Sequence, residues 1–173
     1  MQTDTLIAAT RERADLLETL AVHRGFLLRT VRDLTDEQAA FRPTASELCL
    51  GGIIKHVTHV EEGWANFIWE GPSAIGAVDE AAYAAHAAGF DMGGATLADL
   101  IAGYEHVARR TDELVATVRS LDDSHPLPEA PWFEAGARWS GRRVLLHIIA
   151  ETSQHAGHAD IIRETIDGAK TMG

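Results

Sequence analysis

The chain has few of the features that direct a protein to a membrane or to an oxidising compartment. Cys49 is the single cysteine among 173 residues, which excludes a disulfide within the chain and a cysteine-rich zinc site. No uninterrupted apolar run approaches the roughly 18 residues that a membrane-spanning helix needs. The amino-terminal segment has no apolar core of the signal-peptide type. We therefore expect a cytoplasmic protein that does not enter a membrane.

Positive charge is also scarce. Lysine and arginine total 15 against 26 aspartate and glutamate residues, and the formal net charge is −11. Because phosphate backbones and anionic lipid headgroups repel such a chain, neither nucleic acid nor a membrane surface is expected as a partner. The hydrophobic fraction of 46% and the charged fraction of 24% are those of an ordinary globular protein. At this length we expect residues 1–173 to form a single domain.

Strand periodicity is absent as well, whereas helical periodicity is strong. The apolar spacing of an amphipathic helix recurs in four segments, which are residues 5–34, 50–69, 97–121 and 140–168. A short capped turn is expected after Thr35, and Thr96 is expected to cap the third helix. The connection at residues 72–95 is rich in glycine and alanine, with a short helix expected near residues 78–86. Four long helices with two long connections predict an all-α four-helix bundle.

Histidine, in contrast, is abundant, with nine residues. On the fourth predicted helix His155 lies within about 40° of the centre of the apolar stripe, and Glu151 lies roughly 80° from it. The two side chains are one turn apart, with about 6 Å between their Cβ atoms, so they can converge on one cation. His56 borders the apolar stripe of the second helix. Two histidines and one glutamate leave a coordination position open, which is typical of catalytic metal sites.

The residues by themselves leave other interpretations open. A glutamate and a histidine one turn apart often form a surface pair, and an inward histidine is often a hydrogen-bonded core residue. Glu61 falls inside the apolar stripe of its helix, where it needs an arginine, a histidine or a metal-bound neighbour. His158, near the rim, and His59, which points outward, are candidates to support the ligands or to carry protons. Three tryptophans are candidates to line a substrate cleft, with core or dimer packing as the alternative: Trp64, Trp132 and Trp139.

Two segments carry a resemblance to a known family. "GGIIKHVTHVEEGW", followed by "LLHIIAETSQHAGHADIIRETIDG", resembles the DinB/YfiT-like superfamily, and the similarity extends to "LTDEQAAFRPTASELCL". The sequence is closest to the actinobacterial DinB-like branch and is related to the N-terminal domain of mycothiol-dependent maleylpyruvate isomerase. The resemblance implies a DinB-like four-helix bundle of up-down-down-up order, often dimeric, that carries a divalent metal.

The resemblance also implies a ligand set. Most members of the superfamily hold the metal with three histidines, one from the second helix and a His-x-x-x-His pair from the fourth. Here Glu151 stands at the first position of that pair, as in the maleylpyruvate isomerases, whose zinc has two histidines and a glutamate. By this resemblance His56, Glu151 and His155 are the metal ligands. Zinc is the expected ion, with nickel or manganese next.

The activity implied by the resemblance is a thiol-dependent S-transferase or isomerase reaction. Mycothiol would occupy the open metal position, and its thiolate would attack an electrophilic small molecule. We expect a homodimer. Two alternatives stay open, a non-catalytic metal-binding or stress-related dimeric bundle and a metal-dependent hydrolase with Glu61 or His158 as base. The electrophilic substrate does not follow from the sequence.

Overall fold

The structure is a computed structural model that describes residues 2–76 and 89–171, with side chains from residue 10 onward. Four long helices form its body: α1 (Gln2–Arg29), α3 (Leu50–Glu70), α5 (Leu97–Thr117) and α6 (Gly141–Asp167). The shorter elements are α2 (Asp36–Ala40), the 3₁₀ helix η1 (Gly71–Ala74), β1 (Ser124–Pro126) and β2 (Arg138–Ser140). None of the described helices combines the length and apolar character that crossing a membrane requires.

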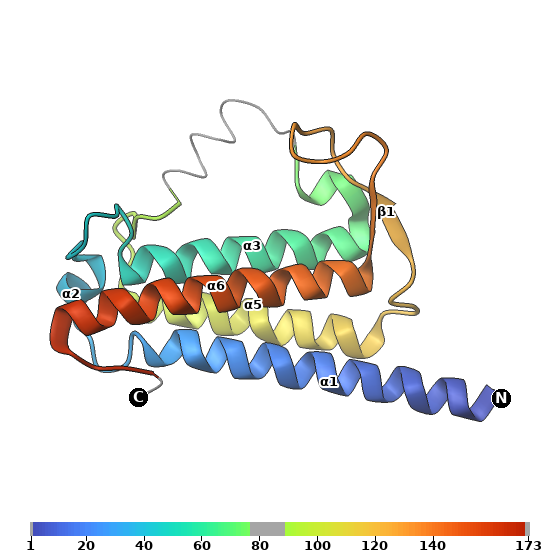
Figure 1. Cartoon of the computed structure of the whole chain (residues 1–173), viewed down its shortest axis with the longest axis horizontal. Coiled ribbons are helices and arrows are strands. Elements are labelled where there is room, and N and C mark those ends of the chain that lie inside the picture. The colour runs from blue at the N-terminus through green and yellow to red at the C-terminus, as the bar shows by residue number, and fades with distance from the viewer. Residues whose placement is uncertain (1, 77–88, 172–173) are drawn as a thin grey trace.

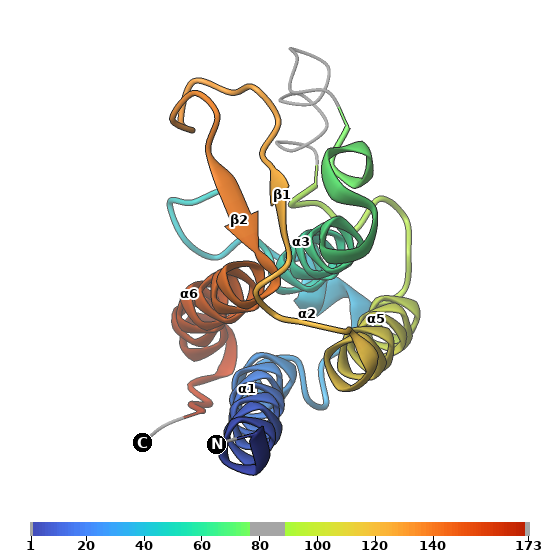
Figure 2. The same ribbon diagram turned by 90° about the vertical axis from the view of Figure 1, so that its right-hand side faces the viewer.

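The four long helices have the up-down-down-up order that the family resemblance implied. Helices α1 and α6 run in one direction along the bundle, and α3 and α5 run in the other (Figure 1). Helix α6 packs against both α1 and α3, and α3 packs against α5 (Figure 2). Because α3 and α5 are parallel, the chain returns along the bundle between them. The short helix predicted near residues 78–86 lies in this connection, outside the described residues.

Local capping explains most of the helix ends. The Thr96 side chain accepts a hydrogen bond from the Asp99 amide, and Ser140 accepts one from the Arg143 amide. Gly168 ends α6 in the left-handed region, with φ of 79°, which a residue with a side chain adopts at a cost. These three predicted boundaries are confirmed. Helix α5 ends at Thr117 rather than at residue 121, and the Arg13 guanidinium donates to carbonyl oxygens of its last turn.

Strand periodicity is absent from the sequence, yet the described residues include one pair of short strands. Strands β1 and β2 form a small antiparallel hairpin in which His125 pairs with Trp139. Each strand has three residues, which is too short for an alternating pattern to stand out in the sequence. The hairpin is fastened to the bundle, since the His125 Nε2 atom lies 3.2 Å from the Ile68 carbonyl oxygen. It thus stands over the α3–α6 pair (Figure 2).

The core consists of two apolar clusters at opposite ends of the bundle. One contains Leu27 and Leu50, and the other contains Leu20 and Leu145. Between them each long helix contributes one buried polar side chain, and these form what we call the central polar layer: Arg24, Glu61, Thr111 and Thr152. Polar groups are tolerated at this depth where they find partners. Arg24 donates to Glu61 on α3 and to Asp112 on α5 and so joins α1 to both helices, whereas the Thr111 hydroxyl donates to the Val107 carbonyl oxygen within α5.

Arg163 fastens the carboxyl end of α1 to α6. Its Nη1 atom donates hydrogen bonds to the carbonyl oxygens of Thr30 and Arg32 at 3.0 and 2.8 Å, and its Nε atom donates to Asp167. Lysine cannot reach all three acceptors, so Arg163→Lys should lower the free energy of unfolding by about 1–2 kcal/mol. Urea unfolding measures this. Arg119→Lys, at an exposed ion pair, is the control, and an equal loss there would contradict the prediction.

Candidate metal centre

Helices α3 and α6 place three potential metal ligands side by side. His56 lies on α3 and is 5% exposed, and His155 lies on the facing side of α6 and is 9% exposed. Glu151 precedes His155 by one turn of α6, with 3.7 Å between its Oε2 atom and the His155 Nε2 atom. The rings of His56 and His155 meet edge to face, with centroids 4.7 Å apart. The structure thus brings together the three residues that the sequence selected.

The spacing of the donor atoms fits a cation. One ligand atom from each of His56, Glu151 and His155 lies within 4.8 Å of the other two. A tetrahedral zinc ion about 2.1 Å from its ligands holds them about 3.4 Å apart. The three side chains therefore close on an ion by movements of about an ångström, within the reach of side-chain rotation. Two imidazoles and one carboxylate are also a donor set that zinc accepts.

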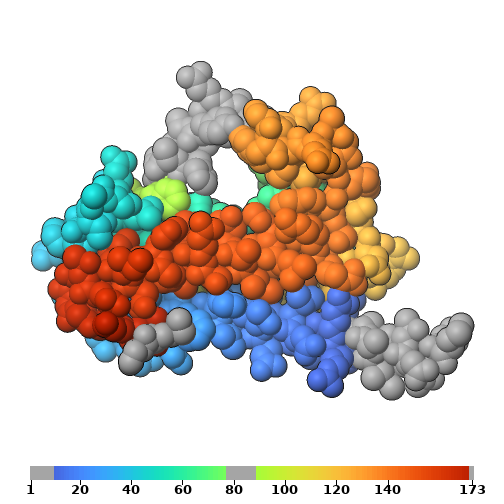
Figure 3. Space-filling model, viewed as in Figure 1, coloured from blue at the N-terminus to red at the C-terminus, as the bar shows by residue number. Residues whose placement is uncertain are grey.

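The group is more open on one side than on the other. The Glu151 side chain is 29% exposed, whereas the His155 side chain is 11% exposed. Solvent and small molecules therefore reach the centre past the carboxylate. In the space-filling view the loop between β1 and β2 rises above α6 (Figure 3), on the side where the hairpin stands over α3 and α6.

An aromatic cluster adjoins the Glu151 side. Trp64 and Trp139 stack with centroids 4.8 Å apart, and the ring of His147 meets both edge to face at 4.9 and 5.1 Å. The His147 Nε2 atom lies 3.9 Å from the Glu151 Oε1 atom. Burial, together with the charge of Arg143, lowers the pKa of His147 and so favours its neutral form. The cluster is therefore an aromatic wall next to the carboxylate, with the Arg143 guanidinium carbon 4.3 Å from the centroid of the Trp139 ring.

A model of the mycothiol-S-transferase family matches residues 15–168. The chain belongs to this family. The match spans α3 and α6 and includes His56, Glu151 and His155. It confirms the resemblance to the DinB/YfiT-like superfamily and the four-helix fold expected from it. A comparison with curated proteins gives no match.

The other candidates in this member of the mycothiol-S-transferase family differ in their surroundings, and only His158 is in ring contact with one of the three donors. Glu61 is fully buried and accepts hydrogen bonds from the Arg24 guanidinium, so arginine is the neighbour that its burial requires. The His59 side chain is exposed on α3. The ring of His158 lies 5.4 Å from that of His155, and its buried Nδ1 atom has no hydrogen-bond partner among the described residues.

The three tryptophans expected at a substrate cleft divide into two groups. Trp64 and Trp139 share the aromatic cluster, whereas Trp132 lies on the loop between β1 and β2 and is 55% exposed. Its ring lies 6.0 Å from that of Phe133, whose ring in turn meets Trp139 edge to face. His147 and Arg143 also belong to this region.

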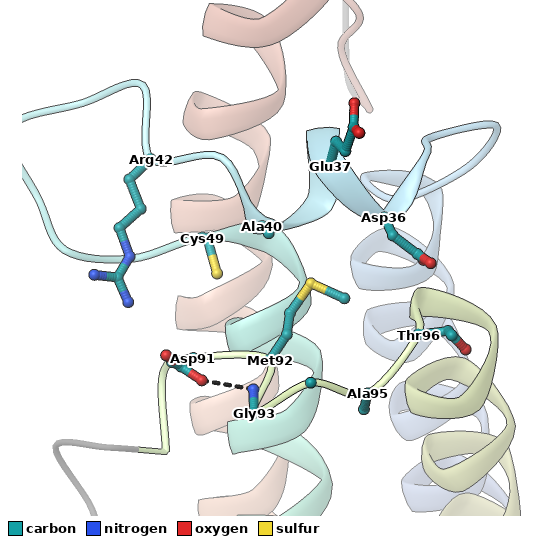
Figure 4. Close-up of a pocket in the computed structure, with 11 residues that line it drawn as sticks. Asp36, Glu37, Ala40, Arg42, Cys49, Asp91, Met92, Gly93, Ala95 and Thr96 are labelled. Carbon is teal, nitrogen blue, oxygen red and sulfur yellow. Dashed lines mark hydrogen bonds between the residues drawn. The ribbon is translucent and has the colours of Figure 1, made fainter.

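A separate cavity of about 700 Å³ opens at the end of the bundle between α2, the start of α3 and the segment that precedes α5 (Figure 4). Asp36, Arg42, Cys49 and Asp91 are among its lining residues. None of the three donor residues lines it. The cavity nonetheless lies beside Cys49 and is lined by residues of the segment before α5, the same segment that contacts His56.

Proposed function

We propose that the chain is a metal-dependent mycothiol S-transferase in which His56, Glu151 and His155 hold one divalent cation. The convergence of their donor atoms within 4.8 Å, in a member of the mycothiol-S-transferase family, carries the proposal. Zinc is the first choice because imidazole nitrogen suits it, and the carboxylate extends the range toward manganese, with nickel also accepted.

The chemistry follows from the donor set and its exposure. A cation held by three protein ligands lowers the pKa of a thiol that binds it and so supplies a thiolate nucleophile near neutral pH. His56 and His155 orient the site from its buried side, and Glu151 keeps one carboxylate at the side that solvent reaches. In the overall reaction a sulfur–carbon bond forms, the bond from that carbon to its leaving group breaks, and the thiol proton passes to solvent.

The electrophile is proposed to pack against the aromatic cluster. Trp64, Trp139 and His147 lie on the Glu151 side of the centre, and their aromatic rings favour a flat, apolar body. The exposed Trp132 offers further apolar surface on the 127–137 loop. The substrates are thus a small thiol and a small electrophile.

That the chain forms a single domain, that it is a homodimer and that it is cytoplasmic stay predictions. Sedimentation tests the homodimer, and cell fractionation tests the location.

The deciding experiment uses protein made without a histidine tag. Its metal content is measured, and it is then incubated with mycothiol and monobromobimane, whose conjugate is quantified by chromatography. We expect enzyme-dependent conjugation that a chelator abolishes and zinc restores. Protein that contains metal but forms no conjugate would instead favour the non-catalytic metal-binding bundle, and metal-free protein would contradict the proposed site. Turnover of an ester or amide without any thiol would favour a hydrolase.

Truncation of the aromatic wall should weaken binding of the electrophile. Trp64→Ala removes a ring that stacks on Trp139 and meets His147, so the KM for the electrophile should rise about tenfold, the equivalent of about 1.4 kcal/mol. Metal content should not change. Trp69→Ala, on the same helix at a 73% exposed position, is the control, and a KM that responds equally to both changes would contradict the proposed wall.

A further inference from the structure

The ring of Phe90 lies flat on the imidazole of His56. The two centroids are 4.2 Å apart and the ring planes differ by 26°. The same phenyl ring lies 5.7 Å from the ring of His155. Phe90 belongs to none of the four long helices, because it lies in the segment that precedes α5. A residue from a connection therefore covers one face of the candidate metal centre.

Histidine needs such a neighbour if its ring is to hold one orientation. Rotation about the last side-chain torsion of histidine is broad, since it joins a tetrahedral to a planar carbon. In His56 the phenyl ring of Phe90 lies against one face, and the ring of His155 approaches at 4.7 Å with an interplanar angle of 64°. Turning the His56 ring by a large angle would drive it into Phe90.

We propose that Phe90 is a positioning residue for His56, which holds the imidazole with a nitrogen directed at Glu151 and His155. The proposal rests on the proposed metal site. It assigns a role to the segment before α5, which the four-helix description leaves out. Residues that hold metal ligands in place commonly change metal affinity by about 10–100-fold when they are replaced.

The backbone of Phe90 reaches α3 because Gly52 has no side chain. A Cβ atom at Gly52 would lie 2.0 Å from the Phe90 carbonyl oxygen and 2.3 Å from its carbonyl carbon. Gly52 precedes His56 by four residues, so the two lie on the same face of α3, one turn apart. The phenyl ring of Phe90 can thus extend from its point of backbone contact to the His56 ring on the next turn.

Hydrogen bonds fasten the same segment to the start of α3. The Cys49 thiol lies 3.6 Å from the Phe90 carbonyl oxygen, to which it donates, and accepts from the Gly52 amide. The Lys55 Nζ atom donates to the Asp91 carbonyl oxygen at 2.9 Å. Figure 4 shows Cys49 and Met92 close together at this end of α3. The position of Phe90 is therefore set by backbone contacts as well as by its ring.

The test measures both the ring contact and the metal. In metal-free protein the His56 ring protons, assigned with a His56→Gln variant, should show an upfield ring-current shift in the NMR spectrum that Phe90→Leu removes. In a chelator competition, Phe90→Leu should weaken zinc binding about tenfold. Leucine keeps apolar volume at the site, and circular dichroism checks that the variant is folded.

A matched pair of glycine variants tests the anchor. Gly52→Ala should displace the Phe90 backbone and weaken zinc binding in the same direction, whereas a Cβ at Gly63, also on α3, meets no atom within 4 Å, so Gly63→Ala should bind zinc as the wild type does. Wild-type ring shifts and wild-type zinc affinity in Phe90→Leu would overturn the role of Phe90 alone. A wild-type chain that binds no zinc would overturn the proposed function and the role of Phe90 with it.

Discussion

Replacement of His155 by alanine should remove the divalent cation from the protein and abolish S-transferase activity. Three donors hold the proposed ion, and the two that remain cannot enclose it. Residues that only support metal ligands change the metal affinity by up to about 100-fold when they are replaced. The loss of zinc affinity in His155→Ala should be larger than this. His56→Ala should have the same effect, because its nitrogen approaches from the other helix. Metal analysis and chelator competition measure both variants.

The carboxylate position allows a sharper comparison. Glu151→Ala should lose the metal, whereas Glu151→His restores the three-histidine pattern of most DinB-like proteins and should keep zinc while lowering the affinity for manganese. His106→Ala, at an exposed histidine on α5, controls for the loss of an imidazole. Unchanged metal content in His155→Ala and Glu151→Ala would show that the ligand set is wrong.

The pairing of Glu151 with His155 could be predicted because both lie on one helix. Helical geometry fixes the relation of residues four positions apart before any tertiary contact is known. His56 belongs to the same group only because α3 faces α6. Helical geometry does not give this contact, and the family resemblance supplied it. The helix ends at Thr96, Ser140 and Gly168 could also be predicted, because each depends on a local hydrogen bond or backbone conformation that is typical of its residue type.

Contacts between distant segments could not be read in this way. Phe90 lies in a connection without periodicity, and Trp64 lies on α3 whereas Trp139 lies on β2, with α5 between them in the chain. One signal was present in the sequence, since adjacent glycines at Gly51 and Gly52 inside a helix cost stability and indicate a close approach of another segment. The sequence could not say that Phe90 is what approaches.

Glu61 shows the same limit in the core. Because Glu61 lies in the apolar stripe of α3, its carboxylate needs a partner. The sequence left three kinds of partner open, an arginine, a histidine or a metal-bound neighbour. Helical projection places a residue relative to its own helix but does not align two helices along the bundle. Only the assembled bundle, in which the Arg24 side chain of α1 reaches across to Glu61 on the diagonally opposite helix α3 (Figure 2), shows that Arg24 is the partner.

Glu61→Ala should lower the free energy of unfolding by about 3–5 kcal/mol, because it leaves the Arg24 guanidinium buried without its main counter-ion. Arg24 is 6% exposed and Glu61 is fully buried. Asp112, which accepts a hydrogen bond from Arg24 at 2.8 Å, stays and should bring the loss toward the lower value. Urea unfolding followed by circular dichroism measures the change. Glu62→Ala, at an exposed pair with Arg110, should cost less than about 1 kcal/mol.

Removal of both charges separates the contribution of the pair from the cost of an unpaired charge. The double variant Arg24→Met with Glu61→Leu should regain most of the stability that Glu61→Ala loses, since apolar residues of similar volume often replace a buried ion pair without loss. A double variant as unstable as the single one would show that the ion pair itself stabilises the bundle. Full recovery of stability together with an altered metal affinity would instead assign the central polar layer a different role. The layer would then fix how α3 faces its neighbours, and so where His56 lies relative to Glu151.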